Sequence, residues 1–224
     1  MPAKRLPDTD EERMRVLETI IDLEENAKEK KAISLRDIHD LKNLLLTYER
    51  LHIGAKQALE DEIAAEKNCF HLFQKAQLYI SHFIQVLYLT VIRQEMKVEN
   101  LACYGLEYSD DFTLPDLSTQ KAVIEWGERV INGEAERTGQ GGSPIYNPSI
   151  TKVKVHYDLF KEADYSLKIY CQNTNRSRES MEDLYDKIDS LIWSAWTKAE
   201  FTYGTLPPKE REKKYNEYGI QFYD

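Results

Sequence analysis

The strongest constraint on the fold is a long segment with almost no helix-breaking residue. Between Ser34 and Asn100 the chain has no proline and a single glycine, Gly54. Apolar residues recur along this segment at intervals of three and four, which is typical of an amphipathic α-helix. A similar pattern covers residues 150–199. Because these two patterns make up half of the 224-residue chain, we expect an all-α fold.

Each of these patterns is too long for one helix of a compact domain. An unbroken helix over residues 34–100 would be roughly 100 Å long. The polar run EDEIAAEKN, residues 60–68, offers a place for a break, with Asn68 as a cap. The run QNTNRS, residues 172–177, offers a second break. The sequence therefore predicts two helical hairpins.

The two predicted hairpins are similar in sequence. One offset aligns residues 38–50 with residues 150–162, and the same offset aligns residues 72–80 with residues 184–192. Each hairpin would expose an apolar face that it cannot bury alone. We therefore expect the hairpins to pack into an antiparallel four-helix bundle.

The remaining segments are expected to pack outside this bundle. Thr9 and Glu12 have the spacing of a capping box, which indicates the start of an N-terminal amphipathic helix within residues 1–33. The predicted bundle region is residues 34–224, which divides into a hairpin (34–100), a crossover with its own helix (101–147), a second hairpin (148–204) and a C-terminal tail (205–224).

Charge and composition narrow the classes of partner and location. The net charge of -9 argues against nucleic acid, because affinity for a phosphate backbone comes mainly from lysine and arginine. The longest segment without a charged residue, 76–92, is too short and too polar to span a bilayer, so no membrane partner is expected. The N-terminus has no secretory signal pattern, and the three cysteines form no CxxC pair. We therefore expect a cytoplasmic protein with reduced thiols.

The glycine-rich stretch GQGGSPIYNPSI, residues 139–150, is the only segment that could be taken for a phosphate-binding loop. Such a loop would follow a strand and end in lysine followed by serine or threonine, whereas this stretch follows a predicted helix and has no lysine before Lys152. We interpret it as a joint between two helices. The alternative is a weak anion site at the start of the next helix, helped by Arg137.

One pair of polar residues interrupts the apolar pattern at equivalent positions. His52 stands where the first hairpin should be apolar, and Asp164 has the equivalent position in the second hairpin. Residues at equivalent depth in a duplicated bundle could meet, and a buried imidazole–carboxylate pair would be an acid–base candidate. The alternatives are a structural polar pair and simple exposure of both residues.

Metal and cofactor sites are not expected. A carboxylate-bridged metal pair in a helical bundle uses Glu-x-x-His motifs, and a metalloprotease uses HExxH. The sequence contains no HExxH motif, and its single Glu-x-x-His, Glu49 to His52, is one short of the two that such a metal pair needs. We therefore assign no catalytic residue, no metal ligand and no cofactor.

The C-terminal sequence YNEYGIQFYD is rich in aromatic residues. An exposed string of this kind is unfavourable in water, so it should lie against something. It could pack along its own bundle, or it could dock onto another copy or another protein. The candidate interaction surface consists of Tyr215, Tyr218, Phe222 and Tyr223.

Four stretches carry a resemblance to a group of bacterial all-helical proteins with no assigned activity: SHFIQVL, WGERVINGE, NPSITKVKVHYDLF and LPPKEREKKYNEYGI. The resemblance covers most of the chain from Ser34 onward. It implies a helical bundle in a bacterial cytoplasm, and it implies no catalytic residue.

Taken together, these observations favour a non-catalytic cytoplasmic protein that acts through protein–protein interaction or self-association. The alternative function is a small-molecule-binding protein or an enzyme, with a polar pocket in the bundle around His52 and Asp164.

Overall fold

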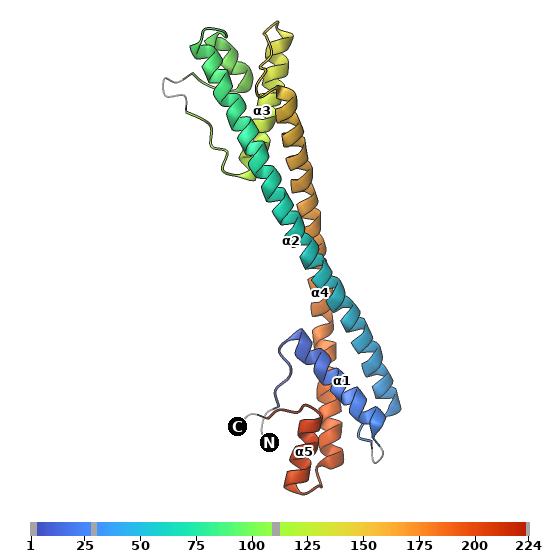
Figure 1. Ribbon diagram of the computed structural model, residues 1–224. Coiled ribbons are helices and arrows are strands. Elements are labelled where there is room, and N and C mark those ends of the chain that lie inside the picture. The colour runs from blue at the N-terminus through green and yellow to red at the C-terminus, as the bar shows by residue number, and fades with distance from the viewer. Residues whose placement is uncertain (1–3, 28–30, 109–112, 223–224) are drawn as a thin grey trace. The chain divides into compact units, whose positions relative to one another are not determined.

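The computed structural model describes residues 4–27, 31–108 and 113–222, and every regular element in these ranges is a helix (Figure 1). The all-α expectation is confirmed. The elements are α1 (Asp10–Asn26), α2 (Leu35–Ile92), the 3-10 helix η1 (Val98–Tyr104), α3 (Gln120–Gly139), α4 (Ile150–Tyr203) and α5 (Pro208–Glu217).

The two longest helices are unbroken, so both predicted breaks are wrong. Helix α2 has 58 residues and α4 has 54. The run at residues 60–68 consists mainly of alanine, glutamate and lysine, which are strong helix formers, and its polarity reflects exposure to solvent. In the run at residues 172–177, Thr174 is buried and its hydroxyl donates to the backbone oxygen of Ala58 in α2 at 3.1 Å.

Because the two long helices are unbroken, the sequence similarity between the two predicted hairpins has a different structural explanation. Each predicted hairpin is a single helix, so the four-helix bundle of two hairpins is not confirmed. The common offset aligns one long helix, α2, with the other, α4. Residues at equivalent positions in the two helices therefore need not lie at the same level of one core.

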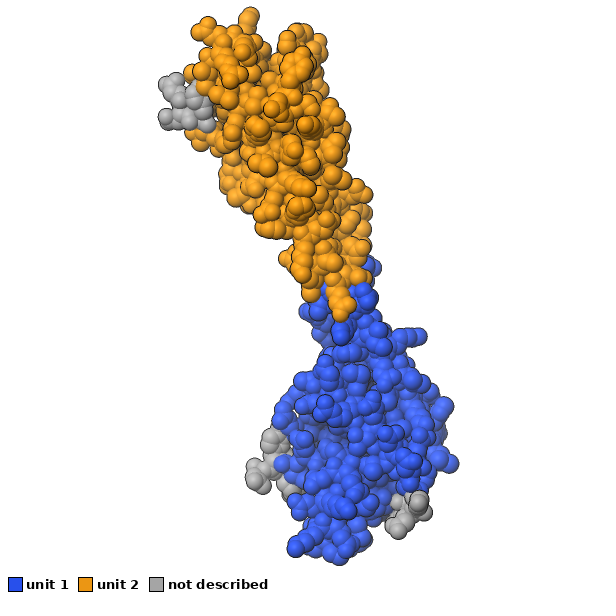
Figure 2. All heavy atoms as spheres, viewed as in Figure 1, with its two compact units in different colours: residues 1–59, 173–224 blue, residues 60–172 orange. Residues whose placement is uncertain are grey.

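The chain divides into two compact units (Figure 2). Unit 1 consists of residues 1–59 and 173–224, and unit 2 of residues 60–172. These boundaries do not coincide with the predicted boundaries at residues 33, 100 and 148. Each long helix contributes one part of its length to each unit.

In unit 1, α1 and α5 pack with the N-terminal part of α2 and the C-terminal part of α4. The predicted N-cap at Thr9 is confirmed, because its Oγ1 accepts from the backbone NH of Glu12 at 3.2 Å. Ser34 caps α2 in the same way, since its Oγ accepts from the backbone NH of Asp37 at 3.2 Å. The largest fully buried side chains of this core are Leu17, Ile20, Leu41, Tyr48 and Trp196.

In unit 2, α3 and η1 pack with the remaining parts of α2 and α4. The predicted crossover helix is confirmed, with Val123, Gly127 and Val130 on its buried face. A Cβ atom on Gly127 would lie 2.3 Å from the ring of Tyr157, so glycine is needed for this close approach of α3 to α4. The largest fully buried side chains of this core are Ile80, Phe83, Ile84, Leu87, Leu101, Tyr104 and Phe160.

Candidate functional site

One cluster of polar side chains in unit 1 surrounds Asp10, the first residue of α1. Its carboxylate accepts a hydrogen bond from the hydroxyl of Tyr48 at 2.6 Å. The other carboxylate oxygen lies 3.9 Å from Nδ1 of His52, which is about a quarter exposed. Asp10 therefore links a buried tyrosine with a partly exposed imidazole.

Two tyrosines next to Asp10 stay protonated at neutral pH. Burial, and then the hydrogen bond to the Asp10 carboxylate, raise the pKa of Tyr48. The same two causes, in the same order, raise the pKa of Tyr185. The hydroxyls of both residues therefore act as donors, and the carboxylate is a fixed acceptor beside His52.

This cluster opens into a groove of ≈ 450 Å³. Acidic, basic and apolar side chains line it, so it could hold a small polar molecule that carries both signs of charge. The lining residues are Asp10, Glu11, His52, Ala55, Lys56, Leu59, Thr174, Arg178, Met181, Glu182 and Tyr185.

The predicted partner of His52 is placed elsewhere. His52 belongs to unit 1, whereas Asp164 belongs to unit 2. The carboxylate of Asp164 is buried and forms an ion pair with Lys168 at 2.6 Å. The structure thus gives each residue its own partner, because the predicted pairing depended on hairpins that the unbroken helices do not form.

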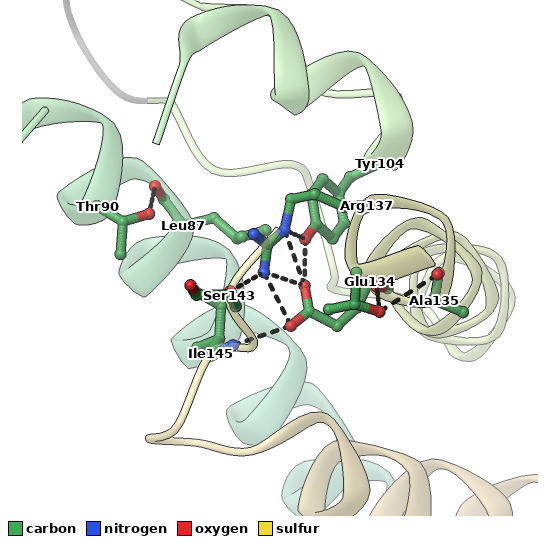
Figure 3. A network of polar contacts seen from close by, with 9 residues as sticks. Leu87, Thr90, Tyr104, Glu134, Ala135, Arg137, Ser143 and Ile145 are labelled. Atoms are coloured by element: carbon green, nitrogen blue, oxygen red, sulfur yellow. Dashed lines mark hydrogen bonds and ion pairs between the residues drawn. The ribbon is translucent and has the colours of Figure 1, made fainter. Parts of the chain in front are cut away.

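A second polar cluster lies in the interior of unit 2 (Figure 3). Glu134 and Arg137 of α3 are 1% and 4% exposed and form an ion pair at 2.8 Å. The hydroxyl of Tyr104 donates to Glu134, and Arg137 Nε donates to the Tyr104 oxygen at 2.7 Å. Burial and the Glu134 carboxylate raise the pKa of Tyr104, although Arg137 opposes this effect.

The same cluster holds the glycine-rich stretch. Arg137 donates to the backbone oxygen of Ser143 at 2.8 Å, and the backbone NH of Ile145 donates to Glu134 at 2.9 Å. A Cβ atom on Gly142 would lie 2.7 Å from the guanidinium of Arg137, so the loop needs glycine there. The stretch is a joint fixed by a buried ion pair. The alternative of an anion site helped by Arg137 is wrong, because Glu134 already pairs with that guanidinium.

The aromatic tail packs mainly on unit 1. Tyr218 is buried, and its hydroxyl donates to Glu24 at 2.6 Å. Tyr215 is half-buried and lies against the ring of Phe222, which is 39% exposed. Tyr223 lies outside the described residues. Of the candidate interaction surface, Tyr218 is therefore an interior residue in this structure.

Unit 2 has an open groove between α2 and α4. Its volume is ≈ 490 Å³, and three alanines, Ala64, Ala65 and Ala163, are among the residues that line it. Leu159 and Tyr170, both on α4, also line it, with 44% and 39% of their surface exposed. The groove is thus open to solvent and has a mixed lining, in which polar and apolar side chains have similar shares. Its other lining residues are Asp61, Asn68, Leu72, Glu162 and Ser166.

The spacing of the buried positions in α3 could have predicted the buried ion pair, although the positions of the apolar residues alone do not indicate it. The buried positions Val123, Gly127 and Val130 continue at spacings of four and three to Glu134 and Arg137. Two opposite charges at buried positions of one helix, three residues apart, indicate an internal ion pair.

Three observations bear on the remaining site classes. Among the described residues, no group of three or more His, Cys, Asp and Glu side chains could hold a metal ion. In the same part of the chain, no helix has the length and apolar character needed to cross a membrane. Comparison of the chain with family models, curated proteins and solved structures finds no match.

Proposed function

We propose that the protein acts without catalysis, by binding another protein chain, and that the groove between α2 and α4 in unit 2 is the contact surface. The observation that carries this proposal is the exposure of Leu159 and Tyr170 beside a groove lined with alanine. Small residues let a helix approach closely, and the large apolar side chains of α4 beside them would be covered by it. The free thiols of Cys69, Cys103 and Cys171 fit action in the cytoplasm.

Site-specific photo-crosslinking in the cells that produce the protein tests the proposal. A photoreactive amino acid at Leu159 should form an adduct with a protein. The same amino acid at Leu46, which is 64% exposed on α2 in unit 1, is the matched control and should give little adduct. If position 159 gives no more protein adduct than position 46, the groove is not a contact surface and the proposal fails.

A second function is favoured by a separate observation, the groove beside His52. Asp10 holds an acceptor next to the imidazole, and Arg178 and Lys56 supply positive charge at the same groove. These groups support binding of a small molecule with an anionic group and a hydrogen-bond donor, as in the alternative of a ligand-binding protein or an enzyme.

Thermal-shift measurement against a panel of small phosphorylated and carboxylated metabolites tests this second function. A ligand should raise the melting temperature of the wild type, and the rise should be lost in Arg178→Ala and in His52→Ala. The control is Arg176→Ala, an exposed arginine on the same helix that does not line the groove. Absence of a rise with every compound would count against the ligand site.

A further inference from the structure

We infer that the occupant of the unit 2 groove is a second copy of this chain, which packs antiparallel with a two-fold axis near Asn68. This inference rests on the proposed function, because it names the partner of the same surface. It is carried by a self-complementary pattern of side chains on α2 at this groove.

The pattern begins with three polar residues seven positions apart. Asp61, Asn68 and Lys75 are all exposed, and a spacing of seven places them on nearly the same side of α2. Asp61 and Asn68 line the groove. The acidic residue and the basic residue stand at equal distances along the helix on either side of the asparagine.

A two-fold axis at Asn68 places each residue of one copy opposite the residue of the other copy that lies equally far from Asn68 in the other direction along the helix. With the axis at Asn68, Asp61 of one copy lies opposite Lys75 of the other, and this pairing occurs twice. Like charges would be opposed in a parallel pairing, where Asp61 would meet Asp61. Charge complementarity therefore selects the antiparallel arrangement.

The apolar residues of the groove fit the same axis. Ala64 and Leu72 both line the groove and lie four residues on either side of Asn68. The axis therefore places a small residue of one copy opposite a large residue of the other, which allows side chains to interdigitate. The two asparagines meet at the axis, and an asparagine at a helix–helix seam is a known means of fixing register.

The second copy also covers the exposed apolar side chains of α4. Its α2 would lie along α4 against both Leu159 and Tyr170, and the four helices at the contact would form a four-helix bundle from two chains. Two helices alone leave such side chains in water, whereas four helices bury them.

Sedimentation equilibrium of the purified full chain tests the inference. The mass should rise with concentration from the single-chain value of 26.2 kDa toward twice that value. Asp61→Lys and Lys75→Asp should each raise the dimer dissociation constant by about tenfold or more, because each places like charges opposite one another. The double variant Asp61→Lys/Lys75→Asp exchanges the two charges and should restore most of the affinity.

Lys67→Asp is the matched control. It is the same change on an exposed lysine of the same helix, on a side roughly 100° away from Asn68, and should leave the dissociation constant unchanged. Circular dichroism verifies that each variant keeps its helices. A constant single-chain mass from micromolar to millimolar concentration overturns the inference, and so does a double variant that binds no better than the two single variants.

The crosslinking experiment separates failure of this inference from failure of the proposed function. An adduct at position 159 with a different protein, together with a monomeric purified chain, would contradict the inference of a second copy but would support a groove that binds protein. A monomeric chain that gives no more adduct than the control would contradict both the inference and the proposed function.

Discussion

Each unit has a glutamate in its interior, and the two are stabilised in different ways. Glu134 in unit 2 is paired with Arg137 and accepts further hydrogen bonds from Tyr104 and the backbone NH of Ile145. Glu24 in unit 1 is fully buried, and Oε1 accepts from two neutral groups, the hydroxyl of Tyr218 at 2.6 Å and the backbone NH of Ala32 at 3.1 Å. Its other oxygen, Oε2, is buried with no hydrogen-bond partner in the described part of the chain.

The two glutamates show that a buried carboxylate can be stabilised either by an opposite charge or by neutral hydrogen-bond donors. In unit 2 the charges are compensated by each other, so removal of one partner leaves the other uncompensated in the interior. In unit 1 the carboxylate, which belongs to α1, fixes two neutral donors, the backbone NH of Ala32 after α1 and the hydroxyl of Tyr218 in the C-terminal tail. We therefore expect unit 2 to be sensitive to loss of charge, and unit 1 to loss of a hydrogen-bond donor.

The largest expected effect is that of Arg137→Met. This variant leaves the carboxylate of Glu134 buried without its cation, and should lower the free energy of unfolding of unit 2 by about 3–5 kcal/mol. Urea unfolding gives the total loss, and amide hydrogen exchange locates it. The amides of unit 2 should exchange faster, whereas those of α1 and α5 should keep their protection.

Arg129→Met is the control for this experiment. Arg129 is an exposed arginine of the same helix, and its guanidinium lies over the ring of Trp126. Its loss should cost less than about 1 kcal/mol. An Arg137→Met variant no less stable than Arg129→Met would mean that the ion pair does not hold the interior of unit 2.

The second prediction compares the two tyrosines that donate to the buried glutamates. Tyr218→Phe removes one of the two donors to Glu24 and should destabilise unit 1 by about 1–3 kcal/mol. Tyr104→Phe should cost less, because Glu134 keeps Arg137 and the NH of Ile145. Urea unfolding of both variants measures the difference, and a larger loss for Tyr104→Phe would reverse the comparison.

The comparison also indicates what the sequence could and could not predict. Apolar spacing identified the helical regions, and the capping-box residues identified the cap at Thr9, since both depend on local interactions. It missed the buried glutamates, because a charge is normally a sign of exposure. In α1 the buried residues are Leu17, Ile20, Ile21 and Glu24, so one position of the buried side carries a charge.

Helix length was the other feature that sequence alone did not predict. Whether a polar run ends a helix depends on what packs against it, and the contact of Thr174 with Ala58 joins segments far apart in the chain. The expected meeting of His52 with Asp164 depended on that prediction. The cluster of His52 with Asp10 needed the position of α1, which local spacing does not give.

The third prediction concerns alkaline pH. Burial, followed by the hydrogen bond to Glu24, raises the pKa of Tyr218, whereas the rise for Tyr104 is opposed by Arg137. A pKa above that of the unfolded chain, about 10, means that the folded state holds the proton more tightly. This stabilisation is complete below pH ~10 and is lost as the pH rises toward the folded-state value, by up to about 1.4 kcal/mol per pH unit for each tyrosine.

Urea unfolding as a function of pH measures this effect. Stability of the wild type should decline above pH ~10. Tyr218→Phe and Tyr104→Phe should each reduce the slope of that decline by up to about 1.4 kcal/mol per pH unit, because each removes one tyrosine whose pKa is raised in the folded chain. Equal slopes for the wild type and Tyr218→Phe would show that this tyrosine ionises no less readily in the folded chain.

The smallest expected effect is that of Glu24→Gln. The change removes a buried negative charge, which is favourable, but it places an amide NH₂ where Oε2 has no partner, which is unfavourable. Because the two effects oppose each other and the amide oxygen can still accept from Tyr218, the free energy of unfolding should change by less than about 1 kcal/mol. Glu134→Gln should cost more, since Arg137 would lose its counter-charge. If urea unfolding gives equal losses for the two variants, neutral donors stabilise a buried carboxylate as well as arginine does, and the contrast between the units disappears.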